Sequence, residues 1–259
     1  MGLIPVNKDQ LELMRKSGQI SAKALKKALE AAQIGVSELE VDKAAGDEIY
    51  KLGGDWSYKT VPGYDWATCV TVNQEVVHGI PKERKIQNGD LVSVDLAAVY
   101  KGWHTDNAWT VLVGQESGVM SQEFEEKKRF LQVGEEALFL GIKQAVAGKR
   151  VGDISAAIQK KVEGAGYHIV RALVGHGVGR EMHEEPEVPG YGRVGTGPVL
   201  KEGMTLAIEV IYTAGTSEVV IAEDNWTYES EDGSMAGLFE MSIVVGKKKA
   251  EILTDWRKV

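Results

Sequence analysis

Hydrophobic residues in the N-terminal region recur at helical spacing. Asn7 followed by Gln10 has the pattern of a capping box, and apolar side chains then recur at helical intervals up to Gly35. A second capping box, Ser37 with Glu40, opens a further stretch that we expect to end at the glycine pair at positions 53 and 54. The pattern therefore predicts two consecutive helices.

The remainder of the chain contains strand-like runs and two more helical stretches. Runs rich in β-branched residues at 69–72 and 91–100 predict strands, and 108–113 is read as the hairpin partner of the second run. Helices are expected at 122–147 and, capped by Asp153, up to about Gly164. The later strands are predicted at 169–174, 204–213, 218–222 and 238–245, around a Gly- and Pro-rich loop at 186–198.

The connections between successive strands indicate the fold class. They are too short to hold crossover helices, which favours an α+β protein with an antiparallel sheet over a doubly wound parallel one. No linker or low-complexity stretch divides the chain, so we expect a single domain over residues 1–259.

Composition excludes several classes of protein. The chain is 43% hydrophobic, enough for a sizeable core, and its net charge of −8 argues against binding DNA or RNA. A single cysteine excludes a disulfide framework and a Cys-rich zinc site. The sequence has neither a run of about 18 apolar residues nor a signal peptide, so we expect a soluble, cytoplasmic protein without membrane contact.

Three carboxylates occupy positions where the pattern predicts buried strands. Asp95, Glu209 and Glu240 each have mostly apolar neighbours one and two positions away. Either each acid points to solvent from a half-exposed strand, or the three share a cation, which is the more economical explanation because an unpaired buried carboxylate is unfavourable. Asp106 would join them if 91–100 and 108–113 form a hairpin turning near 101–102, although read alone it is an ordinary turn residue.

Three of the five histidines lie in informative contexts. Glycines flank His176 in Gly-His-Gly-Val-Gly, so the backbone can pack closely and present the imidazole at a strand end. His183 begins His-Glu-Glu-Pro, which lacks the second histidine of the HExxH zinc motif, and His78 precedes Gly-Ile-Pro at the end of a short strand. His104 and His168 have no such context and are read as ordinary surface or core histidines.

Together these residues resemble the type I methionine aminopeptidases of the pita-bread metallopeptidase superfamily. The resemblance extends from about residue 8 to about residue 252. It implies two related α+β halves with a curved antiparallel sheet around a central dimetal site. The matching features are the runs 73–81, 175–179 and 183–186 and the ordered set Asp95, Asp106, His176, Glu209 and Glu240.

The resemblance implies a ligand set for two divalent ions. Asp95 would bind one ion, His176 and Glu209 the other, and Asp106 and Glu240 would bridge them. The four carboxylates would balance the charge of two divalent cations. A set rich in oxygen with one imidazole and no thiolate suits Mn, Fe(II), Co or Zn.

The implied reaction is removal of the initiator methionine from new protein chains, with preference for a small second residue. Metal coordination makes water acidic enough to serve as the nucleophile near neutral pH, and Glu209 would be the general base. His183 would stabilise the oxyanion of the scissile carbonyl, and His78 would contact the scissile nitrogen and assist the leaving amine.

The pocket for the first residue departs in part from the family pattern. Met182 replaces a usual aromatic residue, Val61 falls where a Tyr is common, and the run 62–65 differs from the usual one. Thr105 and Met241 replace more typical neighbours of ligands. A methionine side chain still suits an apolar, sulfur-tolerant pocket, so strictness for Met is the property these changes affect. The matching pocket positions are Tyr64, Cys69, Met182 and Trp226; Cys69 has an equal reading as a small buried hydrophobe.

Two alternative functions stay open at this point. One is an Xaa-Pro peptidase of the same fold, although such enzymes usually carry a substantial domain before the part matched here. The other is a non-catalytic pita-bread module that binds proteins, which would be expected to lack ligands. The implied partners are nascent polypeptide N-termini and the ribosome; the lysine run 247–249 could contact ribosomal RNA but is better read as a solvated run of charge. We expect a monomer.

Overall fold

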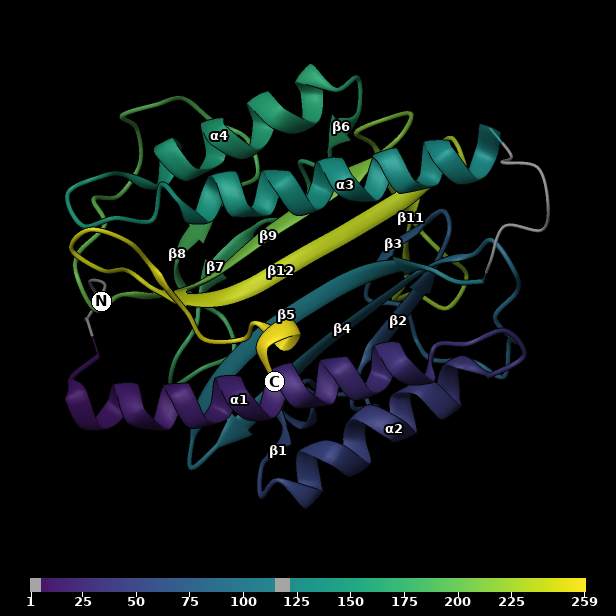
Figure 1. Cartoon of the computed structure of the whole chain (residues 1–259), viewed down its shortest axis with the longest axis horizontal. Coiled ribbons are helices and arrows are strands. Elements are labelled where there is room, and N and C mark those ends of the chain that lie inside the picture. The colour runs from purple at the N-terminus through teal and green to yellow at the C-terminus, as the bar shows by residue number, and fades with distance from the viewer. Residues whose placement is uncertain (1–5, 115–121) are drawn as a thin grey trace.

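Among the described residues, four α-helices cover one face of a large antiparallel sheet (Figure 1). The computed structural model describes residues 6–114 and 122–259. In Figure 1, α1 and α2 lie over one half of the sheet and α3 and α4 over the other. The helices are α1 (Lys8–Ala31), α2 (Glu38–Lys51), α3 (Gln122–Ile142) and α4 (Val151–Gly164).

The main sheet has ten strands, and its central path runs β1-β4-β5-β12-β9-β7-β8. A smaller sheet has the order β10-β11-β3, and all pairs of named strands in both sheets are antiparallel. The predicted α+β class with an antiparallel sheet is therefore confirmed. The strands are β1 (Asp55–Trp56), β2 (Cys69–Val72), β3 (Glu75–Val77), β4 (Leu91–Tyr100), β5 (Trp103–Leu112), β6 (His168–Ile169), β7 (Gly175–Gly177), β8 (Glu184–Val188), β9 (Thr205–Thr213), β10 (Val219–Ile221), β11 (Tyr228–Ser230), β12 (Ala236–Val244) and β13 (Glu251–Ile252); short 3-10 helices occupy Ser57–Thr60 and Trp256–Lys258.

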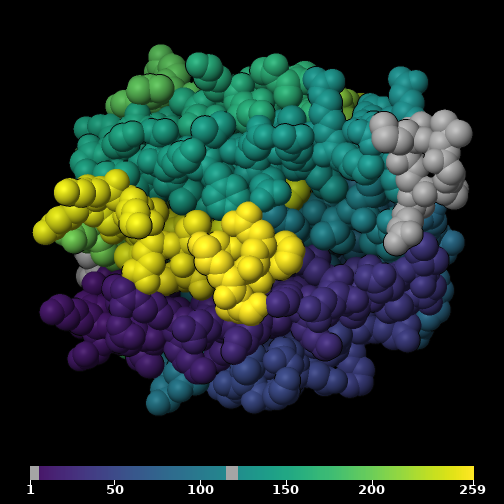
Figure 2. All heavy atoms as spheres, in the orientation of Figure 1, coloured from purple at the N-terminus to yellow at the C-terminus, as the bar shows by residue number. Residues whose placement is uncertain are grey.

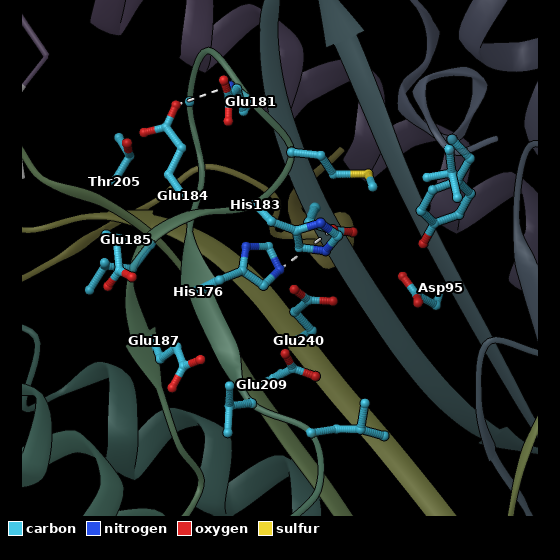
Figure 3. A pocket seen from close by; sticks show the side chains of 18 of the residues that line it. Asp95, His176, Glu181, His183, Glu184, Glu185, Glu187, Thr205, Glu209 and Glu240 are labelled. Atoms are coloured by element: carbon cyan, nitrogen blue, oxygen red, sulfur yellow. Dashed lines mark hydrogen bonds and ion pairs between the residues drawn. The ribbon is translucent and has the colours of Figure 1, made fainter. Parts of the chain in front are cut away.

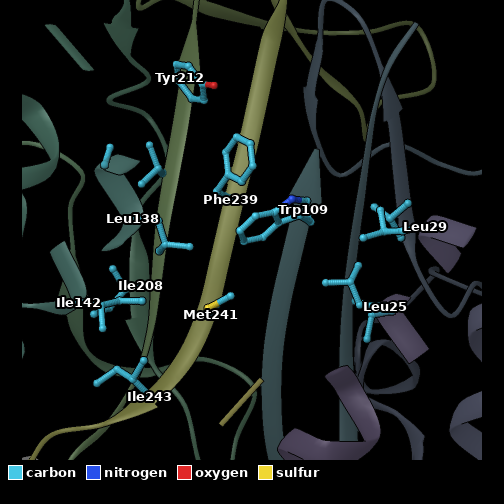
Figure 4. Packing of buried hydrophobic residues seen from close by; sticks show 14 of the residues in the cluster. Leu25, Leu29, Trp109, Leu138, Ile142, Ile208, Tyr212, Phe239, Met241 and Ile243 are labelled. Carbon is cyan, nitrogen blue, oxygen red and sulfur yellow. The ribbon is translucent and has the colours of Figure 1, made fainter. Parts of the chain in front are cut away.

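Successive side chains of β12 point to opposite faces of the sheet. Phe239, Met241 and Ile243 belong to the main hydrophobic core under the helices, whereas Leu238 and Glu240 line a cavity on the opposite face. In the core the ring of Phe239 packs edge-on against Trp109, with ring centroids 4.8 Å apart (Figure 4). Each large apolar side chain buried in this way contributes roughly 1.5–3 kcal/mol. The helices therefore anchor one face of the sheet and leave the other face to carry chemistry.

The C-terminal segment closes the molecule over α1. In Figure 2 it lies, in yellow, against the purple helix on the same face. Arg15 of α1 donates from Nε to Glu251 Oε1 at 2.6 Å, and η2 (Trp256–Lys258) packs on α1. The last strand and the first helix thus hold the two ends of the described chain together.

The capping boxes at Asn7 and Ser37 are present as predicted, and both helices follow them directly. Two other helix boundaries differ from expectation. α3 ends at Ile142 rather than at 147, because Val146 leaves the helix to form a bridge with Gly246. Asp153 lies at the third position of α4, not at its cap, and accepts from the Arg150 backbone N–H at 2.8 Å.

Three strand predictions are corrected as well. β5 begins at Trp103, not at 108, because the two-residue turn of Lys101 and Gly102, both with positive φ, lets pairing start at once. The strand expected at 169–174 is reduced to β6 (His168–Ile169). The expected loop at 186–198 instead begins inside a strand, since β8 (Glu184–Val188) pairs with β7 (Gly175–Gly177).

Candidate metal centre and substrate pocket

The acidic and histidine side chains of the site occupy two adjacent rows across the main sheet. Cross-strand pairing aligns the first row, and the second lies two residues further along each strand, on the same face. Small residues alternate with the functional ones, which leaves space above the sheet. The first row is Asp95, Ala108, Glu240 and Glu209. The second row is Ala97, Asp106, Ser242, Ala207 and His176.

The register brings the side-chain ends close together. Three groups of three residues have candidate ligand atoms that all lie within 4.8 Å of one another, and Glu240 belongs to two of these groups. Asp106 Oδ2 lies 3.9 Å from His176 Nε2. Figure 3 shows Glu240 and Glu209 on one side of the paired imidazoles and Asp95 across the cavity. The groups are Asp95, Asp106 and Glu240; His176, Glu209 and Glu240; and Asp106, His176 and His183.

The electrostatics of the cluster are unfavourable for the protein alone. Burial raises the pKa of Asp95 to about 7, and burial together with the charge of Asp95 raises the pKa of Glu209 to about 8. Burial and neighbouring carboxylates also raise the pKa of Asp106 and of Glu240 well above the usual range. Burial, with His183 beside it, lowers the pKa of His176 to about 4, so its imidazole is neutral. A divalent cation would bind the neutral imidazole and the ionised carboxylates, and its charge would offset the repulsion that raises these carboxyl pKa values.

Unpaired oxygens supply a test of whether a metal fits this site. One oxygen of each of Asp95, Asp106 and Glu240 is buried without a hydrogen-bond partner, and the last two residues are only 4% exposed. Native proteins rarely leave such atoms unsatisfied, because desolvation without a partner is costly. The donor set of carboxylates and one or two imidazoles matches hard or borderline divalent ions. The residues therefore fit a metal centre.

Two further histidines lie at the same cavity. The ring of His183 packs edge-on against His176, with centroids 4.4 Å apart. His78 follows β3 (Glu75–Val77) and its ring packs edge-on against Tyr228. Burial lowers the pKa of both His183 and His78, with the charge of His183 contributing for His78. Both imidazoles are thus neutral near pH 7 and can donate one N–H each.

The backbone at His78 is held in an unusual conformation. Its φ of 58° lies in the left-handed region that side chains other than glycine seldom adopt. Gly79 follows, where a Cβ would lie 2.2 Å from the Val70 carbonyl oxygen, so the chain presses directly on β2 (Cys69–Val72). Such strain persists only where the surroundings enforce it and is common at functional sites. It aims the His78 ring into the cavity.

An apolar pocket adjoins the cluster on the side of Asp95. Tyr64, Cys69 and Met182 are buried in one small hydrophobic cluster, with Val61 and Trp226 packed against it. The four pocket positions expected from the sequence therefore come together. The Tyr64 hydroxyl donates to the Thr68 carbonyl at 2.7 Å, and its ring lies 5.4 Å from that of Trp226.

Sequence reasoning missed Tyr58. It lies in η1 (Ser57–Thr60), is buried in the pocket cluster, and partly offsets the rise that burial causes in the pKa of Asp95. No pattern in an irregular connection could have identified it, because its contact with Asp95 depends on the tertiary fold. Glu185 and Glu187, which line the cavity wall, were also unassigned.

The remaining histidines behave as expected from their contexts. His104 is buried and its Nδ1 lies 2.9 Å from the Ser57 hydroxyl, while His168 is exposed on β6 (His168–Ile169). Neither lines the cavity.

Thr105, which the sequence singled out as a neighbour of Asp106, lies on the helix side of β5. Its hydroxyl forms hydrogen bonds with the hydroxyls of Ser17 and Ser21, at 3.0 and 2.9 Å.

The cluster of carboxylates and imidazoles on this antiparallel sheet has the donor set of a divalent-metal centre. The model of metallopeptidase family M24 matches residues 12–237. A methionine aminopeptidase of Clostridium acetobutylicum is 41% identical over 253 residues, covering 97% of this chain and 98% of that relative. The crystal structure of a methionine aminopeptidase from Thermotoga maritima superimposes with a TM-score of 0.93 at 40% identity, covering 98% of this chain and 99% of that one.

The chain belongs to metallopeptidase family M24. A prolidase from Pyrococcus furiosus shares the fold with a TM-score of 0.77 at 22% identity, covering 97% of this chain and 65% of that one. The fold is therefore the pita-bread fold, and family membership together with the ligand clusters supports use of divalent metal. Within the described residues, no helix is both long and apolar enough to cross a membrane.

Proposed function

We propose that this chain removes the N-terminal methionine from new proteins and peptides, with preference for a small second residue. One observation carries the proposal: a single cavity contains both the two rows of carboxylates and histidine and the apolar pocket beside them. The relatives that match nearly the full chain are named methionine aminopeptidases, which supports the same activity here.

The proposed ligand set holds two divalent ions. Asp95 would hold one ion, His176 and Glu209 would hold the other, and Asp106 and Glu240 would contribute to both. The two triads that share Glu240 support this division. When bound, the ions supply Lewis acidity and a water acidic enough to ionise near neutral pH. Mn, Fe(II), Co and Zn are the candidate metals.

Three side chains have proposed roles in proton transfer and charge stabilisation. Glu209 accepts a proton as general base, a role supported by its place beside His176 and Glu240 in the cluster. His183 donates a hydrogen bond to the scissile carbonyl oxygen as negative charge develops there. His78 contacts the scissile nitrogen and assists the departure of the amine.

The first residue's side chain is proposed to enter the pocket of Tyr64, Cys69, Met182 and Trp226. Its walls are apolar or aromatic with one thiol, which suits a methionine thioether. With Val61 and Met182 in place of aromatic rings, the pocket is more deformable. A branched residue such as leucine then loses only about 1–3 kcal/mol, so cleavage of Leu-Ala peptides at a few per cent of the Met-Ala rate is expected.

Further expectations from the sequence belong to the same proposal. The chain acts as one catalytic domain and as a monomer in the cytoplasm, on nascent N-termini. Contact with the ribosome would involve the lysines at 247–249. The pair Lys247 and Glu202, at 3.5 Å, favours an ordinary surface role for the first of these lysines.

A comparison of peptides tests the proposal. Metal-free protein is supplied with each candidate metal, and kcat/KM is measured for Met-Ala-Ser, Leu-Ala-Ser, Met-Arg-Ser and an Xaa-Pro peptide. Met-Ala-Ser should be cleaved much faster than Met-Arg-Ser, because a bulky second residue meets the wall that includes His78. Preference for the Xaa-Pro peptide would favour the Xaa-Pro exopeptidase activity instead. Absence of hydrolysis with metal bound would favour a binding module.

A further inference from the structure

Arg84 joins two buried carboxylates that belong to different elements. Its Nε donates to the carboxylate of Glu38, the first residue of α2, and a terminal nitrogen donates to that of Glu75, the first residue of β3. Glu38 is 0% exposed and Glu75 is 3% exposed. We name these three residues the Arg84 clamp.

The clamp depends on Arg84 for its charge balance. In the part of the chain that the structure describes, no other cation forms an ion pair with Glu38. Lys82 Nζ lies 3.5 Å from Glu75 Oε1, but the same ammonium is shared with Asp224 at 3.3 Å. Removing one partner of a buried ion pair leaves an uncompensated buried charge, which is strongly unfavourable. Loss of Arg84 should therefore loosen both carboxylates.

The clamp fastens the two ends of one chain segment. Glu75 and Arg84 are nine positions apart, and between them the chain leaves β3, passes through His78 and returns to the start of α2. The returning end is also bonded to that helix, since the backbone N–H of Glu38 donates to the Arg84 carbonyl at 3.3 Å. The segment 75–84 is therefore a loop whose base is closed on itself and fixed to α2.

His78 lies within this loop and reaches the cavity. Its φ of 58° is in the left-handed region, where a residue with a side chain stays only if the surroundings enforce it. The next residue, Gly79, has a carbonyl that accepts from the Val70 N–H at 3.0 Å and from the Tyr64 hydroxyl at 3.2 Å. These bonds hold the middle of the loop, and the clamp holds its base.

We propose that Arg84 is a positioning residue for His78: the clamp fixes the loop 75–84 so that the imidazole stays beside the scissile nitrogen. This inference rests on the proposed aminopeptidase activity and on the role of His78 in it. A displacement of about 1 Å in a catalytic group can cost about a hundredfold in rate, so a loosened loop base has a measurable effect. None of the proposed metal ligands lies in this loop.

Two substrates that differ in one atom test this role. One is Met-Ala-Ser, and the other is its thioester analogue, in which sulfur replaces the scissile nitrogen. The peptide must release an amine, which needs a proton, whereas the thioester releases a thiolate, which needs none. The measured quantity is the ratio of kcat/KM for the peptide to kcat/KM for the thioester. Incomplete folding or metal loading cancels in this ratio, because both substrates are measured on one preparation.

Variants of the two residues should lower the ratio in a fixed order. His78→Ala should lower it by about a hundredfold, the contribution of a positioned proton donor, and Arg84→Met by about three- to tenfold, because the imidazole is displaced but present. Arg84→Lys keeps the charge without the planar fork and should lower the ratio less, and it serves as the test if Arg84→Met does not fold. An unchanged ratio in the Arg84 variants would overturn the inference.

The double variant His78→Ala/Arg84→Met tests whether the effect passes through the imidazole. Its ratio should equal that of His78→Ala within about twofold, because a residue that acts through His78 has no effect once that side chain is gone. A further fall would overturn the inference. An unchanged ratio in His78→Ala would remove the proposed role of His78 and, with it, that of Arg84.

Arg257 is a matched control. It also joins two carboxylates, donating from Nε to Asp255 at 2.9 Å and from Nη1 to Glu135 at 2.8 Å, and its side chain is 34% exposed against 38% for Arg84. It lies in the C-terminal 3-10 helix and does not line the cavity. Arg257→Met should also lower Tm but should keep the ratio. A fall as large as that in Arg84→Met would show a general effect of lost stability and contradict the clamp.

A spectroscopic measurement adds a readout without turnover. In proton–carbon spectra of the metal-free protein with labelled histidine, the His78 ring signals can be assigned from His78→Ala. They should shift or broaden in Arg84→Met and stay in place in Arg257→Met, while those of the exposed His168 stay in place in both. An unchanged His78 signal in Arg84→Met would contradict the clamp.

Failure of this inference differs from failure of the proposed activity. If the unmodified, metal-loaded protein cleaves neither substrate, the activity is wrong, and the His78 signal alone decides whether the clamp positions the ring. If both substrates are cleaved and His78→Ala lowers the ratio while the Arg84 variants do not, only the role of Arg84 is wrong.

Discussion

Glu240 shows how much a single position contributes to the site. It lies in β12 (Ala236–Val244), is almost fully buried, and belongs to both triads that carry the proposed ligands. Its neighbours along the strand, Phe239 and Met241, belong to the core on the other face. One residue therefore contributes a carboxylate to the site from a strand whose adjacent side chains pack in the core.

Metal stoichiometry should depend most on the bridging residues. We expect Glu240→Ala and Asp106→Ala to lose both ions, because each serves two metals, whereas Asp95→Ala should retain part of the binding. Metal content and calorimetric titration with Mn or Co measure this, with His168→Ala as a control on an exposed histidine outside the site. Stoichiometry like that of the unmodified protein in both bridging variants would contradict the ligand assignment.

His183 should affect the rate more than the metal. The substitution His183→Ala is expected to lower kcat by about 10²–10³, the effect of losing one donor to a developing oxyanion. His183→Gln keeps an N–H donor and should recover part of the rate. Metal content of both variants is the control; an unchanged rate at full metal content would show that His183 has no such role.

At the scale of elements, an ion pair connects two walls of the site. Lys82 Nζ lies 3.3 Å from Asp224 Oδ2 and 3.5 Å from Glu75 Oε1. Asp224 Oδ1 in turn accepts from the backbone N–H of Trp226 at 3.0 Å. The strand that leads to His78 and the loop that carries Trp226 are thereby linked, so Lys82 is a positioning residue for the pocket.

Loss of this link should weaken binding of the first residue. Lys82→Met is expected to raise KM for Met-Ala-Ser about two- to fivefold with a smaller change in kcat, and Lys82→Arg should restore it. Lys85→Met, which removes the nearby pair with Glu40 at 3.0 Å, is the matched control. A rise in KM of the same size for Lys85→Met would contradict a specific link to Trp226.

The pH dependence of this link has a definite sign. Burial by itself would raise the pKa of the Asp224 carboxyl. Hydrogen bonds from Thr227, Trp226 and Lys82 outweigh burial and lower this pKa to about 2. Because the pKa of Asp224 is lower in the folded protein than in the unfolded chain, where it is near 4, the ionised carboxylate stabilises the folded state above about pH 4. This stabilisation is lost as the pH falls towards 2. The effect of Lys82→Met on KM should therefore be constant between pH 6 and 8, and a strong change in that window would contradict this account.

For the whole molecule, metal and fold stability are coupled. Four carboxyl groups face one another in the metal-free protein, two of them buried and two partly buried, and bound cations would relieve their desolvation and repulsion. Metal at about a hundredfold its Kd should stabilise the fold by about 2.7 kcal/mol. For a chain of this size that raises Tm by about 5–10 °C.

A variant separates this coupling from general salt effects. Glu240→Gln replaces a buried carboxyl group whose ionisation its surroundings disfavour, so its metal-free form should be at least as stable as the metal-free original, while its gain in Tm from metal should largely vanish. Thermal unfolding with and without chelator measures both quantities. A full gain in Tm for Glu240→Gln would contradict coupling through this cluster.

Much of the local architecture can be predicted from the sequence. The capping boxes at Asn7 and Ser37 and the run 91–100 are local signals, since caps and alternation involve residues a few positions apart. The acids Asp95, Glu209 and Glu240 also stand out without a structure, because a carboxylate in an apolar strand breaks the pattern.

The assembly of these pieces is decided by tertiary structure. The bond from the Asp106 N–H to the Ser242 hydroxyl joins residues 136 positions apart, and pairs of this kind align the two rows of the site. Tyr58 beside Asp95 and the exposed edge at Glu185 likewise depend on which strands become neighbours. Local sequence determines which residues can form a strand and which face each side chain takes. Only long-range pairing, whose register depends on burying the whole sheet under its helices, determines which faces meet.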